Sequence, residues 1–110
     1  MTTEHILRVT GFAASTLDGV GEMADIAEEM GDEDAPMLRA VASAYQRGAL
    51  RFNHAEADTI WRGLSDLSNG EDAYAEDRNA QRADPEGVRM ARAAATGLAT
   101  LMQKVSRTLR

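Results

Sequence analysis

One residue type that carries much of protein chemistry, cysteine, is absent from this chain. It has no cysteine among its 110 residues, which excludes disulfide bonds, thiolate metal sites and a cysteine nucleophile. No apolar run approaches the roughly 18 residues that a membrane-spanning helix needs, and the first residues lack the basic stretch that opens a secretory signal. We therefore expect a soluble, cytoplasmic protein, and its length fits a single domain covering residues 1–110.

Positive charge is missing from much of the first third of the chain. Between Arg8 and Arg39 there is no lysine, arginine or histidine, but the acidic residues there are Asp18, Glu22, Asp25, Glu28, Glu29, Asp32, Glu33 and Asp34. Residues 88–110 have the opposite composition, with no acid and with the basic residues Arg89, Arg92, Lys104, Arg107 and Arg110. Exposed helices usually mix acidic and basic residues. We therefore expect another part of the fold, or a partner, to supply the opposite charge to each of these two segments. The net charge of −6 argues against direct binding to nucleic acid or membranes.

The apolar residues recur every three or four positions almost throughout, which predicts an all-α fold. The predicted helices cover about residues 3–31, 35–67 and 85–109. Asp84-Pro85-Glu86 marks the start of the third, because it offers an N-cap, a proline at the first position and an acid in the first turn. Long helices joined by short turns alternate in direction, so the predicted architecture is an up-down-up bundle of three helices.

A polar connection joins the second and third predicted helices. Ser68-Asn69-Gly70 is a strong stop signal, so residues 68–84 are expected to be exposed. Within them, residues 71–84 have one large apolar side chain, Tyr74, and leave two structures open: a short solvated helix or an irregular segment with a function.

A row of acids is the main candidate recognition surface. At about 100° per residue, one face of the first predicted helix carries Asp18, Glu22, Asp25, Glu29 and Asp32, whereas Glu28 points nearer the apolar edge. Neighbouring carboxylates would be about 5–6 Å apart. Three interpretations remain: a solvated face, a face paired with the basic last turns of the C-terminal helix, or a surface that imitates nucleic acid and so recognises a basic partner.

Part of this row resembles a known enzyme family. Glu22-x-x-Asp25 and Glu29-x-x-Asp32 are similar to the acidic pairs of the all-helical nucleotide pyrophosphohydrolases, which implies a hydrolase dependent on Mg²⁺ or Mn²⁺. That family places its two pairs on separate, facing helices, whereas here both fall on one predicted helix. The hydrolase is therefore our second alternative, and we predict no metal and no cofactor.

Three further residues of the second predicted helix need an interpretation: Trp61, His54 and Glu56. Trp61-Arg62-Gly63 resembles the Trp-x-Gly turn of a family of short two-helix secreted proteins, but the apolar pattern continues beyond it. We interpret Trp61 as a core or interface anchor, with His54 packed beside it. Glu56 falls in the apolar stripe, where an unpaired carboxylate is costly, so we expect it to bend toward solvent or to pair with an arginine.

The sequence favours a non-enzymatic helical protein–protein interaction module that acts as a small regulator, adaptor or inhibitor. The expected partner is a protein with a basic surface, and the heptad-like outer helices favour a homodimer. The first alternative is an acidic, nucleic-acid-mimicking inhibitor of the kind that phages and mobile elements carry. The candidate partner-binding residues are Asp18, Glu22, Asp25, Glu29, Asp32, Trp61 and Tyr74.

Overall fold

A computed structural model describes residues 4–8, 20–46 and 49–109, except the side chains of Glu22 and Gln46. Its elements in chain order are β1 (Glu4–Leu7), α2 (Val20–Glu29), α3 (Ala35–Gln46), β2 (Leu50–Asn53), α4 (His54–Glu76), α5 (Arg78–Ala83) and α6 (Pro85–Thr108). Helices dominate, and the two strands form one small antiparallel sheet. The predicted all-α class is confirmed.

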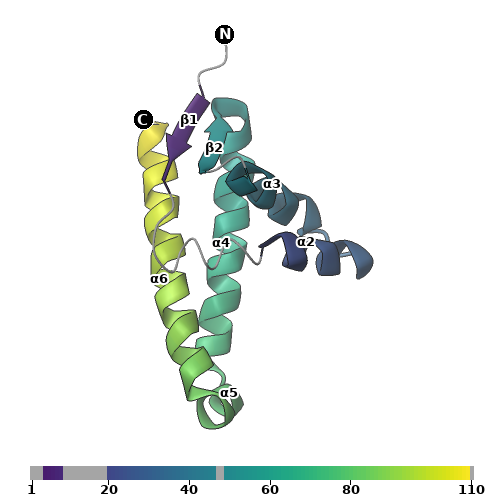
Figure 1. Ribbon diagram of the computed structural model, residues 1–110, viewed down its shortest axis with the longest axis vertical. Helices are drawn as coiled ribbons and strands as arrows, with labels where there is room; N and C mark the ends of the chain where they lie inside the picture. The colour runs from purple at the N-terminus through teal and green to yellow at the C-terminus, as the bar shows by residue number, and fades with distance from the viewer. Residues whose placement is uncertain (1–3, 9–19, 47–48, 110) are drawn as a thin grey trace.

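The long axis of the molecule is an antiparallel hairpin of α4 and α6, joined at one end by α5 (Figure 1). The predicted start of the last helix is confirmed. Asp84 is its N-cap and accepts a hydrogen bond from the Gly87 N–H at 3.0 Å, and Pro85 occupies the first turn. Beside this hairpin, α2 and α3 project together as an arm (Figure 1). The principal axes of the molecule measure 52 × 29 × 22 Å.

The predicted second helix, residues 35–67, is wrong in its bounds. It is divided by β2, in which Leu50 and Phe52 are fully buried and alternate with half-buried neighbours. A capping box then starts α4: Asn53 accepts from the Glu56 N–H at 2.9 Å, and the Glu56 carboxylate accepts from the Asn53 N–H at 3.0 Å. Glu56 thus has a structural role at a helix start.

The predicted stop at Ser68-Asn69-Gly70 is also wrong, because α4 continues to Glu76. The additional turns bury Ala75 against Ala80, Val88 and Ala91 where the hairpin closes. Burial of this second, small cluster offsets the helical cost of Gly70, which is about 1 kcal/mol relative to alanine. Of the predicted connection, residues 71–76 belong to α4 and residues 78–83 form the short helix α5.

The first predicted helix, residues 3–31, is corrected at its start. Residues 4–7 form β1, which pairs antiparallel with β2 from Glu4↔Asn53 to Leu7↔Leu50. The predicted helical stretch at 9–19 lies outside the described residues. Its end is confirmed: Gly31 has a φ of 69°, and the Asp32 N–H donates to the Ala27 carbonyl at 2.9 Å, a geometry that closes helices at glycine.

One main core unites the arm and the hairpin. Its largest fully buried side chains are Phe52, Leu50, Ile60, Leu64, Leu98, Val20, Val41 and Val105. The close approach of α3 to α4 depends on Gly63, because a Cβ there would meet Val41 and would lie 2.8 Å from the Met37 carbonyl oxygen. This contact sets where the arm leaves the hairpin.

Candidate binding cleft

A cleft lies in the angle between the α2–α3 arm and the second half of α4. Its volume is about 300 Å³, and its lining residues are Met23, Leu38, Asp66, Leu67, Gly70, Glu71 and Tyr74. The arm supplies the first two and α4 supplies the other five. The close contact at Gly63 holds α3 against α4 and so positions one wall of the cleft.

An exposed apolar row along α2, continued by the residue that follows the helix, extends the cleft outward. Met23 lines the cleft, Ile26 is 53% exposed and Met30 is 79% exposed. Their spacing of three and four residues places them on one side of the helix, beside the buried row that anchors α2 in the core. Unbranched methionine side chains adapt to differently shaped partners, and a contiguous exposed apolar row is typical of an interaction site.

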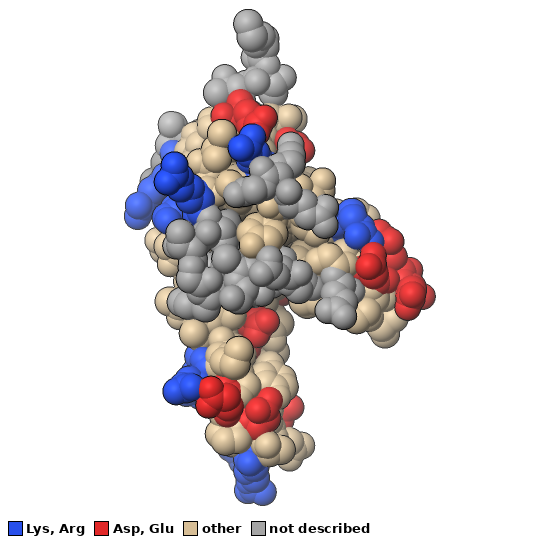
Figure 2. Space-filling view, in the orientation of Figure 1, with Lys and Arg blue, Asp and Glu red and all other residues tan. Residues whose placement is uncertain are grey.

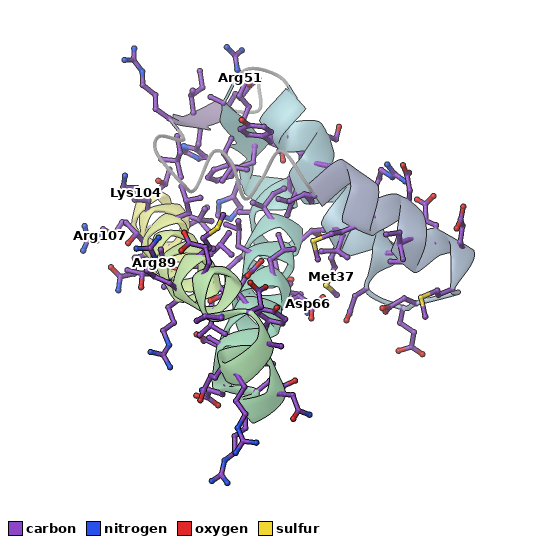
Figure 3. All side chains as sticks on the ribbon, turned by 60° about the horizontal axis from the view of Figure 1, so that its bottom comes forward. Met37, Arg51, Asp66, Arg89, Lys104 and Arg107 are labelled. Atoms are coloured by element: carbon purple, nitrogen blue, oxygen red, sulfur yellow. The ribbon has the colours of Figure 1, made fainter. Side chains whose placement is uncertain are left out.

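Two half-buried carboxylates, Asp66 and Glu71, form the polar part of the cleft. Burial raises the pKa of Asp66, and the neighbouring carboxylates Asp34 and Asp32 raise it further. Burial also raises the pKa of Glu71. Neither carboxylate forms an ion pair with any residue in the described ranges. Figure 3 shows Asp66 with Met37 on the side of α4 from which the arm departs. The cleft therefore pairs apolar surface with negative charge that no cation among the described residues neutralises.

These raised pKa values predict a stability that increases on mild acidification. The folded state binds protons at Asp66 and Glu71 more readily than the unfolded chain does, so the free energy of unfolding should rise as the pH falls from neutral to about 4. Below that, Asp84 opposes the gain, because hydrogen bonds from Tyr74 and the Gly87 N–H lower its pKa and their contribution is lost on protonation. Urea unfolding across this pH range measures the trend.

The matched variant for this prediction is Asp66→Asn, which keeps the shape of the side chain without its charge. It should be more stable than the wild-type protein at neutral pH and should show a smaller rise on acidification. An unchanged pH profile in Asp66→Asn would contradict the burial of this carboxylate.

The predicted acidic row is neutralised in part by the arm itself. Asp25 and Glu28 both form ion pairs with Arg39 of α3, at 2.6 Å and 3.0 Å. The hydrogen bonds that Arg39 donates to these two carboxylates raise its pKa, and the bond to Glu28 has the larger effect. Asp32 accepts a hydrogen bond from the Asp34 N–H at 2.9 Å. Asp18 and the side chain of Glu22 lie outside the described residues, and Glu29 is exposed. Glu28, which the periodicity set apart from the row, is thus one of the two ligands of Arg39.

The basic residues Lys104 and Arg107 at the end of α6 do not pair with the described residues of the acidic row. Figure 2 shows the acids gathered at the outer end of the arm and basic residues on the opposite side of the molecule. Figure 3 shows Lys104 and Arg107 pointing away from the arm, and neither forms an ion pair within the described part of the chain. Arg110 lies outside that part. The cation that binds Asp25 is Arg39 of the arm, whereas one of the three interpretations placed the cations in the C-terminal turns.

The two aromatic candidates lie on different faces of α4. Tyr74 lines the cleft, and its hydroxyl donates to Asp84 at 2.7 Å, which raises the Tyr74 pKa and ties α4 to the start of α6. Trp61 is about 140° away around the helix at 100° per residue and lines a separate groove between α4 and α6. Tyr74 and Met23 of α2 therefore line the same cleft, whereas Trp61 lines a different surface.

Sequence reasoning missed the residues that define the cleft: Met23 as an exposed side chain, and Asp66 and Glu71 as half-buried acids. The spacing of Met23, Ile26 and Met30 was a signal for a second apolar row on α2. Asp66 and Glu71 had no such signal, because their burial depends on where α3 crosses α4.

The described residues hold no cluster of three or more histidine, aspartate or glutamate side chains placed to bind a metal ion. Among the helices in the described ranges, none has the length and apolar character to cross a bilayer. Comparison of the chain with protein-family models, with curated proteins and with solved structures finds no match.

Proposed function

We propose that this protein is a non-enzymatic helical interaction module that binds a basic, amphipathic segment of a protein partner in the cleft between α2 and α4. The observation that carries the proposal is the pair of half-buried carboxylates, Asp66 and Glu71, beside an exposed apolar row. Carboxylates held in this way are costly until a cation reaches them. A partner that supplies both apolar and basic groups satisfies both halves of the cleft.

The recognition mode is that of an amphipathic helix in a groove. Its apolar side packs on Met23, Ile26 and Tyr74, and its lysine or arginine side chains reach Asp66 and Glu71. The exposed acids at the outer end of the arm, Glu29 and Glu33 among them, speed the encounter with a basic partner. By binding such a segment, the module acts as a regulator, adaptor or inhibitor of its partner.

The alternative of nucleic-acid mimicry has weaker support. It requires a row of unengaged carboxylates, whereas Arg39 binds Asp25 and Asp32 accepts a backbone hydrogen bond. The alternative of a metal-dependent hydrolase draws no support from the side chains of Asp25, Glu29 and Asp32, which do not gather in the described structure.

A model peptide tests the proposal. The probe is a fluorescently labelled amphipathic helix of leucine and lysine, and its polarisation is measured against increasing protein at low and high salt. We expect saturable binding that weakens as salt rises, because the Asp66 and Glu71 contacts are electrostatic. A leucine–glutamate helix and a scrambled leucine–lysine peptide are the controls. Equal binding of the scrambled peptide, or tighter binding of the glutamate peptide, would refute the proposal.

A further inference from the structure

A second hollow surface surrounds Trp61 on the outer side of the α4–α6 hairpin. The main groove has a volume of about 500 Å³ and is lined by Trp61, Ala99, Met102, Gln103, Ser106 and Arg107. A hollow of about 320 Å³ adjoins it and shares Trp61 and Ser106, and its other lining residues include Asp58 and Leu109. A third, of about 200 Å³, lies along Trp61 toward α3. Trp61 is 38% exposed and lines all three of these hollows.

We propose that the occupant of this groove is a second copy of the chain, giving a two-fold dimer in which two α4–α6 hairpins pair as four helices. This inference goes beyond the proposed function, because the groove and the cleft are different surfaces. Two-helix hairpins commonly complete a core by packing against two more helices at shallow angles. The hairpin here is packed by the arm and sheet elsewhere, whereas the Trp61 groove is open.

The groove is complementary to itself in shape. A two-fold interface uses the same patch on both subunits, so that patch must carry both a projection and a space to receive it. Trp61 is the projection, and the groove between it and Met102 is the space. Tryptophan is also the side chain that most often anchors an interface.

The groove is also complementary to itself in charge. Arg107 lies on its α6 side and forms no ion pair with the described residues, while Asp58 lies on its α4 side and contacts Arg62 one turn away at 3.1 Å. A two-fold axis along the groove lays α6 of one copy over α4 of the other. That rotation brings Arg107 opposite Asp58 of the partner subunit, so each interface contains the charge pair twice.

The test combines molar mass with the emission of the single tryptophan. Sedimentation of the full chain over a range of concentrations should give twice the monomer mass, with Trp61 emission blue-shifted and protected from a soluble quencher. Dilution should shift the emission to the red as the dimer dissociates. A monomer at all concentrations would overturn the proposal.

Variants assign the interface. Trp61→Ala should weaken the dimer about thirtyfold or more, whereas Met90→Ala, which truncates a 63% exposed side chain of α6 outside the groove, should not. Arg107→Glu should weaken the dimer, and adding Asp58→Lys should restore it. A dimer that survives Trp61→Ala and Arg107→Glu uses another surface, which would also overturn the proposal. Because no peptide is present, this result is independent of the cleft.

If Trp61→Ala alters helical content in circular dichroism, the charge variants decide the matter, because Arg107 and Asp58 are exposed and outside the core. Restoration by the double variant requires the two side chains to face each other across the interface. Failure of the double variant to restore the dimer would refute the proposed axis.

Discussion

Replacing Gly63 with alanine is expected to lower the free energy of unfolding by about 1–3 kcal/mol, the usual cost of inserting a methyl group into a packed contact. The new Cβ would meet Val41 and lie 2.8 Å from the Met37 carbonyl oxygen. Because one of these neighbours is backbone, α3 must move away from α4. That movement outweighs the gain in helix propensity, about 1 kcal/mol, that alanine brings.

Gly70 in the same helix is the matched control. A Cβ at Gly70 meets nothing within 4 Å, so Gly70→Ala should stabilise the protein by about 1 kcal/mol. Urea denaturation of both variants measures the two changes, which should have opposite signs. If Gly63→Ala also stabilised the protein, α3 would not cross α4 at this residue. The displaced arm of Gly63→Ala should also weaken binding of the leucine–lysine peptide, because α2 and α3 form one wall of the cleft.

Reversing both cleft carboxylates, Asp66→Lys with Glu71→Lys, is expected to weaken binding of the leucine–lysine peptide about 100-fold, or about tenfold for each charge. Both acids are half-buried, so an opposing cation at these positions is screened less than on the open surface. The same variant should bind the leucine–glutamate peptide, which we expect the wild-type protein to reject. Fluorescence polarisation measures both affinities.

The control for charge alone is Asp72→Lys. Asp72 is an exposed acid next to Glu71 on α4 but does not line the cleft. If Asp72→Lys weakened binding as much as the double reversal, the effect would come from net charge and not from the cleft. Circular dichroism and urea denaturation verify that the double variant remains folded, which we expect because Asp66→Lys removes the repulsion between Asp66 and Asp34.

Local signals in the sequence are enough to specify some of the helices and their ends. The last helix follows from a sustained three-four apolar spacing and from the Asp84-Pro85 start, and α2 ends where Gly31 allows a positive φ. Leu50–Asn53 is where the same reasoning fails, because four residues are too few to distinguish the alternation of a strand from the apolar spacing of a helix. The Asn53/Glu56 capping box is also a local signal, and it marks the start of α4.

The charges and apolar residues that remain available to a partner depend instead on contacts between distant segments. Arg39 reaches Asp25 and Glu28 across 14 and 11 residues of chain, so the acidic row that is continuous in sequence is partly answered within the arm. Asp66 and Glu71 become half-buried because α3 crosses α4 at Gly63 and lays α2 beside them. Periodicity assigns a residue to one face of its own helix, but it does not specify which other helix covers that face. That depends on contacts between segments far apart in the chain, where the fit of side chains such as those around Gly63 selects one crossing.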